Sequence, residues 1–256
     1  MTKFSANLGF LWSELSLVDG IRAAKLAGFD AVECHWPYET PPQDVADVLE
    51  ETGLVMLGLN TVCGGENEKG LSALPGREQE AREAIDQAIA YARAIDAKNI
   101  HVMAGFASGV EAQATFIENL EYACMGAKKS GITILIEPLN HYDAPGYFLT
   151  NSSHAKEIIE SVGAPNLKLM YDCYHMQIME GDLSRRLTNL LPIIGHIQIA
   201  GVPERGPPDS GEIAYTHLYK LLNDLGYSTP LGAEYRPLGS TEESLDWLAA
   251  IKGKAR

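Results

Sequence analysis

The sequence is short of basic residues. Its 20 lysines and arginines stand against 34 aspartates and glutamates, which gives a formal net charge of −14. Such a charge opposes binding to phosphate backbones and to anionic membrane surfaces. The composition therefore argues against a nucleic-acid or membrane partner.

Cysteine is also scarce, and long apolar runs are absent. The four cysteines are scattered without a C-x-x-C pair, which gives little support to a disulfide framework or a zinc–thiolate site. The start of the chain has too short an apolar stretch for a signal peptide, and no apolar run reaches the roughly 18 residues of a membrane-spanning helix. We expect a soluble, cytoplasmic protein.

Apolar residues are plentiful enough for one large core. The 256 residues with 46% hydrophobic content match the usual size of a single barrel domain of the (β/α)8 type, or TIM barrel. No low-complexity linker divides the chain. We expect a single α/β domain over residues 1–256.

Runs rich in β-branched and apolar residues alternate with segments of helical periodicity, which is typical of a parallel sheet built from βα units. Several helical segments stop at a glycine, such as Gly28 or Gly163, as a left-handed C-cap requires. The predicted strands are residues 4–10, 31–36, 55–60, 99–104, 133–139, 167–172, 195–200 and 232–235. The predicted helices are residues 17–27, 42–52, 78–95, 111–129, 153–162, 183–190, 214–225 and 242–252.

Four apolar runs in the second half of the chain each carry one polar group near their end: Glu137, Asp172, Gln198 and Glu234. A carboxylate or amide in such a run costs several kcal/mol unless it is paired or bound to a cation. The spacings of 35, 26 and 36 residues each fit one strand, one helix and two loops. Because barrel chemistry lies at the C-terminal ends of the strands, we expect all four side chains at one mouth.

The chemistry of this set favours a metal. Three carboxylates and an amide suit a hard cation such as Mg²⁺ or Mn²⁺ better than zinc. Any one acid could instead cap the next helix or pair with a basic side chain, but basic residues in comparable positions are few. An open site of this kind polarises a carbonyl and an adjacent hydroxyl together.

Two histidines and an arginine are candidates for contacting a substrate. His175 follows Asp172 by three residues, and it could lie over a bound substrate or be a surface or core histidine. His101 faces inward on the fourth predicted strand, where it could form a substrate hydrogen bond or simply pack. Arg205 lies in a long loop, residues 201–212, and could contact a substrate carboxylate, because an acidic substrate needs a local cation in so negative a protein.

Further polar residues are expected near the mouth. Glu212, in the same loop, could order that loop or lie in solvent. Asn7 in the first strand and His35 at the end of the second could line the mouth. Asp143 follows Glu137 by six residues and could contact substrate or support a ligand.

Motifs of a known family occur in order along the whole chain. They are Phe4-Ser-Ala-Asn-Leu, Gly28-Phe-Asp-Ala-Val-Glu33, Pro75-Gly-Arg-Glu78, Ile136-Glu-Pro-Leu-Asn-His141, Tyr171-Asp-Cys-Tyr-His-Met176, Gly195-His-Ile-Gln-Ile-Ala200, Gly211-Glu-Ile213 and Glu234-Tyr. Together they resemble the hydroxypyruvate isomerase family, which belongs to the xylose isomerase-like TIM barrels.

The resemblance implies a divalent metal, Mg²⁺ in preference to Mn²⁺, held by Glu137, Asp172, Gln198 and Glu234. It implies that Glu137 and Glu234 are the catalytic proton donor and acceptor. The implied reaction interconverts hydroxypyruvate and tartronate semialdehyde, a small hydroxy-oxo acid pair, through a cis-enediolate.

Other functions stay open at this point. Residues 101–105 and 198–205 resemble a subgroup of 2-oxo-tetronate isomerases, which act on four-carbon acid sugars, whereas residues 137–143 resemble hydroxypyruvate isomerase proper. Related ketose epimerases usually have a histidine at the position of Gln198, which argues against an epimerase. The net charge argues against an endonuclease of the same superfamily. A barrel that binds a sugar acid without turning it over is the non-enzyme alternative, and a homo-oligomer is possible.

Overall fold

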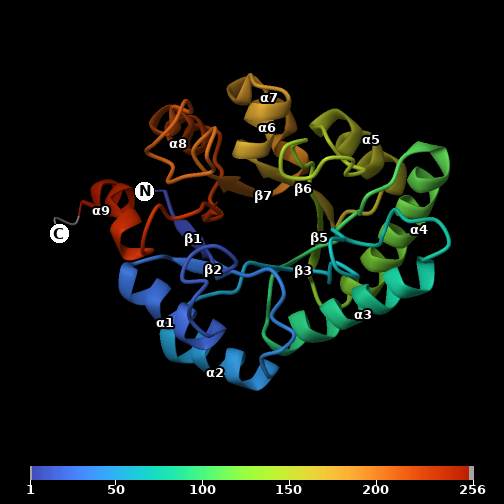
Figure 1. Ribbon diagram of the computed structural model, residues 1–256, viewed down its shortest axis with the longest axis horizontal. Coiled ribbons are helices and arrows are strands. Elements are labelled where there is room, and N and C mark those ends of the chain that lie inside the picture. The colour runs from blue at the N-terminus through green and yellow to red at the C-terminus, as the bar shows by residue number, and fades with distance from the viewer. Residues whose placement is uncertain (1, 254–256) are drawn as a thin grey trace.

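Eight short strands lie in parallel around a central axis in the computed structural model, which describes residues 2–253 (Figure 1). They are β1 (Phe4–Asn7), β2 (Ala31–Glu33), β3 (Gly58–Asn60), β4 (Asn99–His101), β5 (Thr133–Ile136), β6 (Leu167–Asp172), β7 (Ile194–Ile199) and β8 (Leu231–Ala233). Their order is β2-β1-β8-β7-β6-β5-β4-β3. A parallel bridge between Val32 and Met56 joins β2 to β3, which closes the ring.

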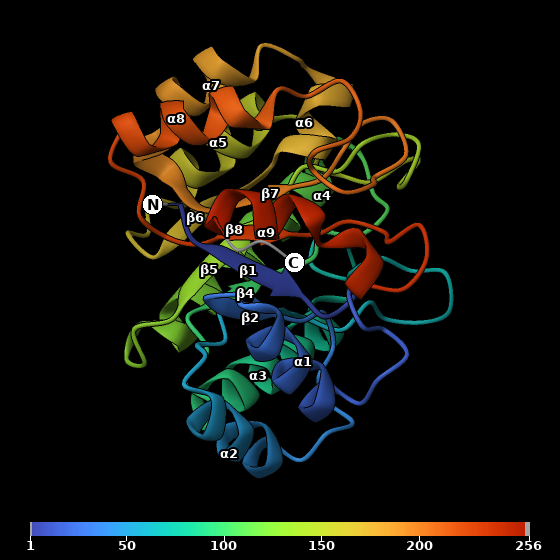
Figure 2. The ribbon, with the colours of Figure 1, turned by 90° about the vertical axis from the view of Figure 1, so that its left-hand side faces the viewer.

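Helices surround the strands on every side, as Figures 1 and 2 show. The α-helices are α1 (Leu17–Ala27), α2 (Pro42–Thr52), α3 (Glu78–Ala94), α4 (Gly109–Lys128), α5 (Ser152–Val162), α6 (Cys173–Met179), α7 (Leu183–Leu190), α8 (Tyr215–Asp224) and α9 (Asp246–Lys252). Two short 3₁₀ helices, η1 (Leu191–Ile193) and η2 (Glu242–Ser244), precede β7 and α9. This is the predicted TIM barrel.

Helix α9 meets the first strand at the barrel wall. Trp247 of α9 packs edge-on against Phe4 of β1, with ring centroids 5.0 Å apart. The last described helix therefore covers the first strand. Among the described residues, no helix has both the length and the apolarity to cross a membrane.

The predicted helix bounds are confirmed at α1, α2 and α7, and glycines cap α1, α2 and α5 in the left-handed conformation. The predicted strands are mostly too long, because strand pairing stops where the chain turns toward the barrel mouth. The prediction of one helix over residues 242–252 was wrong, since η2 and α9 divide that segment. Helix α6 was not predicted.

The register of the strands brings the polar strand ends to one level. Asp172 of β6 pairs with Gln198 of β7, and Gln198 pairs with Gly232 of β8, two residues before Glu234. Parallel strands end at the same edge of a barrel, so these side chains reach the same mouth.

Candidate active site

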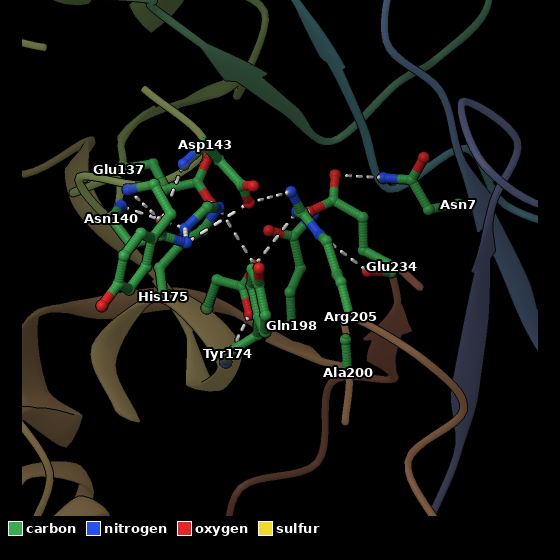
Figure 3. Close-up of polar contacts among 12 residues, drawn as sticks. Asn7, Glu137, Asn140, Asp143, Tyr174, His175, Gln198, Ala200, Arg205 and Glu234 are labelled. Carbon is green, nitrogen blue, oxygen red and sulfur yellow. Dashed lines mark hydrogen bonds and ion pairs between the residues drawn. The ribbon is translucent and has the colours of Figure 1, made fainter. Parts of the chain in front are cut away.

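The four polar residues predicted from the strand ends converge on one buried region. Figure 3 shows Glu137, Gln198 and Glu234 around Arg205, and Asp172 reaches the same guanidinium through an ion pair. Glu137 and Glu234 follow β5 and β8 directly, and they are 6% exposed; Asp172 and Gln198 lie on β6 and β7, and they are 1% and 2% exposed. A cavity of about 390 Å³ opens above them, with both glutamates in its wall. That is room for a small polar molecule.

Glu137 lies between two histidines without a direct hydrogen bond to either. Its Oε2 is 3.6 Å from His101 Nδ1, and its Oε1 is 3.9 Å from His175 Nε2. Within residues 2–253, Oε1 has no hydrogen-bond partner although it is buried. Burial, with the charges of Glu234 and Asp172, raises the pKa of the Glu137 carboxyl well above its usual value.

His175 is fixed in one tautomer by its neighbour Asn140. The backbone N–H of Asn140 donates to His175 Nδ1 at 3.1 Å, and the side-chain Nδ2 lies 2.7 Å from the same atom. The Asn140 Oδ1 is turned away, because it accepts from two backbone N–H groups of the following turn. Burial and the charge of Arg205 lower the pKa of His175 well below its usual value. The neutral ring therefore carries its proton on Nε2, which faces Asp172 at 3.6 Å.

Glu234 differs from Glu137, because three side chains hold it. Asn7 Nδ2 donates to its Oε1 at 2.8 Å, His35 Nε2 donates to the same oxygen at 2.9 Å, and Arg205 Nη2 pairs with Oε2. Burial alone would raise the pKa of Glu234, but the charge of Arg205 and the hydrogen bond from His35 hold it below its usual value. The cavity wall thus holds two different carboxyl groups. The raised pKa of Glu137 favours its protonated form, and the lowered pKa of Glu234 favours its ionised form.

Arg205 lies at the centre of the acidic cluster in Figure 3. Its Nη2 is 3.3 Å from Asp172 Oδ2, and its Nη1 is 3.4 Å from Asp143 Oδ2, in addition to the pair with Glu234. The guanidinium also lies 5.0 Å from the centroid of the Tyr174 ring. Its positive charge compensates carboxylates that were predicted to hold a metal.

Glu33, at the end of β2, orients the side-chain amide of Gln198. Gln198 Nε2 donates to Glu33 Oε2 at 3.0 Å, and the same oxygen accepts from His196 Nε2 at 3.1 Å, while Ser5 Oγ donates to Oε1 at 2.9 Å. In the described chain, Gln198 Oε1 is buried and has no partner. Gly232 leaves the space for Glu33, because a Cβ there would lie 2.2 Å from Glu33 Oε1.

The residues fit a divalent cation. Carboxylate oxygens of Glu137 and Asp172 lie within 4.8 Å of each other, and the unpartnered oxygens of Glu137 and Gln198 are acceptors that burial leaves uncompensated within residues 2–253. Carboxylate and amide oxygens are the ligands that hard cations prefer.

The structure brings most of the predicted substrate residues to the cavity. His101, His175, Asp143 and Arg205 line it, and Asn7 contacts it through Glu234. Glu212 does not line the cavity; it is exposed and accepts a hydrogen bond from Gln177 at 3.1 Å.

Sequence reasoning missed Glu33 and Lys69. Glu33 is an acid at the end of an apolar strand, so the pattern that identified Glu137 applies to it equally. Lys69 carries no such signal, because only the folded loop after β3 brings it to the cavity wall.

Known proteins share this fold and much of this sequence. The family model described as xylose isomerase-like TIM barrel matches residues 21–251. The chain is 43% identical to the 2-oxo-tetronate isomerase of Cupriavidus necator, covering 99% of this chain and 100% of that one. It is 40% identical to the hydroxypyruvate isomerase of Escherichia coli, covering 97% of this chain and 98% of that one.

Solved structures share the fold of this chain. The crystal structure of AP endonuclease, family 2 from Brucella melitensis has a TM-score of 0.94 at 38% identity and covers 98% of this chain and 99% of that one. The 3-keto-D-glucoside 4-epimerase of Escherichia coli has a TM-score of 0.82 at 21% identity, with 99% of both chains covered, which shows a shared fold alone.

Proposed function

Because the chain belongs to the hydroxypyruvate isomerase family of xylose isomerase-like TIM barrels and is an isomerase, we propose that it interconverts hydroxypyruvate and tartronate semialdehyde. The observation that carries this proposal is the pair of buried carboxyls, Glu137 and Glu234, in the wall of one small cavity. Isomerisation of a hydroxy-oxo acid needs a base at one carbon and an acid at its neighbour.

One of the two glutamates removes a proton from the hydroxyl-bearing carbon, and the same residue or its partner returns a proton to the adjacent carbon through a cis-enediolate. Glu234 is the base in this proposal, because Asn7 and His35 hold its carboxylate at the cavity wall. Glu137 lines the same cavity and is the partner of Glu234 in returning the proton.

His101, His175 and Arg205 surround the same space and donate hydrogen bonds to the hydroxyl and carbonyl oxygens of the substrate, while the Asp143 carboxylate accepts one from a hydroxyl. His175 does this as a donor, because its proton lies on Nε2. Orientation of the two reacting carbons between the glutamates contributes beyond the acid–base groups, which alone give about 10²–10⁴-fold.

Glu137, Asp172, Gln198 and Glu234 would hold a divalent metal, Mg²⁺ in preference to Mn²⁺. The tautomer of His175 favours this oxygen set over a ligand set that includes its Nε2, because a protonated nitrogen cannot ligate. A bound cation supplies Lewis-acid polarisation of the carbonyl and the neighbouring hydroxyl.

A four-carbon 2-oxo-tetronate is the second candidate substrate. It is supported by the 43% identity to an enzyme of that name, and the cavity of about 390 Å³ accommodates either length. Turnover of three-carbon and four-carbon oxo acids, measured side by side, separates the two. The net charge of −14 argues against an endonuclease, which would need a basic face.

The acid–base proposal is tested by Glu234→Gln and Glu137→Gln. Both variants should stay folded by circular dichroism and lose turnover of the oxo acid by at least about 10²-fold, since the amide cannot exchange the proton. Glu118→Gln, on the exposed side of α4, is the matched control and should keep normal turnover. Near-normal turnover in Glu234→Gln would refute its catalytic role. Solvent proton exchange at the substrate carbon, followed by NMR in D₂O, distinguishes an isomerase from a binding protein.

A further inference from the structure

Among the described residues, three lysine and arginine side chains lie in the cavity wall, and two of them have no acidic partner. Arg205 is shared among three carboxylates. Lys69 and Arg236 line the same cavity and make no ion pair within residues 2–253. Glu68 also lines the cavity, but its ion pair is with Arg77, which Glu80 shares. Lys69 and Arg236 are therefore the cations of the cavity whose charge is uncompensated.

When a substrate is bound, the site holds negative charge that a further cation would balance. With a divalent cation bound and Glu137 ionised, the acidic cluster contributes four carboxylates, namely Glu137, Asp143, Asp172 and Glu234. The guanidinium of Arg205 and a divalent cation together supply only three positive charges. An oxo-acid substrate adds a further negative charge, which burial makes costly unless another cation faces it.

Lys69 lies where it can bind the negative charge of the substrate. It is half-buried, and its Nζ donates to the backbone oxygen of Asp143 at 2.9 Å, which leaves two ammonium protons for a ligand. The next residue anchors the loop: Gly70 donates to the Cys63 carbonyl at 2.7 Å, and a Cβ on Gly70 would lie 2.3 Å from the Met103 oxygen.

Lys69 lies in the wall of the cavity, beside the backbone of Asp143. Arg236, in contrast, is exposed at the rim, where its guanidinium lies 5.9 Å from the centroid of the Phe10 ring.

We propose that Lys69 binds the carboxylate of the substrate and so selects acid sugars over neutral ones, while Arg236 attracts the anion at the rim. This inference rests on the proposed function and deepens it. It moves the carboxylate contact from Arg205, where the sequence placed it, to the loop after β3. The reaction itself needs no carboxylate on the substrate, so Lys69 should act on binding rather than on proton transfer.

The kinetic test compares an acid with its neutral analogue in the metal-loaded enzyme. Lys69→Met should raise KM for hydroxypyruvate about 10- to 100-fold and change kcat by less than about threefold, because a charge-assisted hydrogen bond is lost. KM for dihydroxyacetone, in which a hydroxymethyl group replaces the carboxylate, should not change. If the four-carbon acid is the better substrate, 2-oxo-tetronate and erythrulose form the equivalent pair.

Three further variants sharpen the test. Lys69→Arg should restore KM to within about threefold, because it retains a charged donor. Arg236→Met should raise KM for the acid only about two- to fivefold, as expected for an exposed charge. Lys156→Met, on α5, makes the same change of net charge away from the cavity and should leave both constants unchanged.

A binding measurement separates this inference from the proposed function. Calorimetric titration with glycerate, and with neutral glycerol as control, reports carboxylate binding without turnover. We expect Lys69→Met to weaken glycerate binding at least about tenfold and to leave glycerol unaffected. Failure of the parent enzyme to bind glycerate, an equal rise of KM for acid and neutral substrates, or a larger effect from Arg236→Met would overturn the assignment of Lys69. Loss of glycerate binding in Lys69→Met without any isomerase activity in the parent would refute the proposed function alone.

Discussion

At the scale of single residues, the amide of Gln198 has its orientation fixed from one side only. Glu33 accepts the Nε2 proton of Gln198, and the pairing leaves Oε1 buried without a partner. An unpaired buried oxygen costs about 1–3 kcal/mol, so a ligand that uses it gains that much in addition to its own bond. Glu33 therefore fixes the Gln198 amide in an orientation that suits the binding of a cation to Oε1.

We expect Glu33→Gln to weaken binding of Mn²⁺ to metal-depleted protein by about 10- to 100-fold, the usual effect of losing a partner behind a ligand. The reason is that a second amide can present its own N–H₂ group to Gln198 and release the fixed orientation. Calorimetric titration measures the affinity directly. Gln43→Glu, an exposed change of opposite sign on α2, controls for net charge. Unchanged affinity in Glu33→Gln would contradict the orienting role of Glu33.

At the scale of elements, the segment after β7 carries a cation into the barrel mouth. Arg205 has a left-handed backbone with φ of 55°, and its backbone oxygen accepts from the N–H of Arg236 at 2.7 Å. Gly201 allows the segment to fold back, because a Cβ there would lie 2.6 Å from the Ser210 oxygen. The loop is thus shaped to hold one guanidinium among the carboxylates.

Arg205→Met tests that electrostatic role. Without metal, the variant should lose about 3–5 kcal/mol of unfolding free energy, because the buried carboxylates then face one another. With saturating Mg²⁺ the loss should shrink, since a cation again opposes them. Urea unfolding in EDTA and in Mg²⁺ measures both values, and Arg185→Met, whose side chain is 82% exposed, should change either by less than about 0.5 kcal/mol. An equal loss in both conditions would contradict the argument.

The elements also show what the sequence could and could not predict. The βα alternation predicted all eight strands near their observed places, because apolar periodicity follows from burial. Helix α6 was missed because it starts directly at the end of β6, where Asp172 caps it by accepting from the Tyr174 N–H at 2.8 Å, and no turn residue separates the two.

The site was predictable to the extent that strand ends determined it. Glu137, Asp172, Gln198 and Glu234 were placed together because the register of parallel strands is regular. The ion pairs of Arg205 were not predictable, because they depend on the conformation of a long loop.

At the scale of the whole molecule, the net charge of −14 makes every cation stabilising to some degree. Diffuse screening depends on ionic strength, whereas a bound divalent ion acts through its own affinity for the folded state. The two effects can therefore be separated at constant ionic strength.

We expect Mg²⁺ at about 100 times its dissociation constant to stabilise the metal-depleted protein by about 2.7 kcal/mol, which corresponds to a rise in Tm of about 5–10 °C for a chain of this length. NaCl at equal ionic strength should give only a small part of that rise. Asp172→Asn should lose most of the Mg²⁺-dependent part, because it removes a charged ligand while it keeps the oxygen that caps α6. Thermal unfolding followed by circular dichroism measures all three. If NaCl matches Mg²⁺, or if Asp172→Asn responds like the parent, the acidic cluster responds to cations only as part of the overall negative surface, and the metal site is refuted without reference to catalysis.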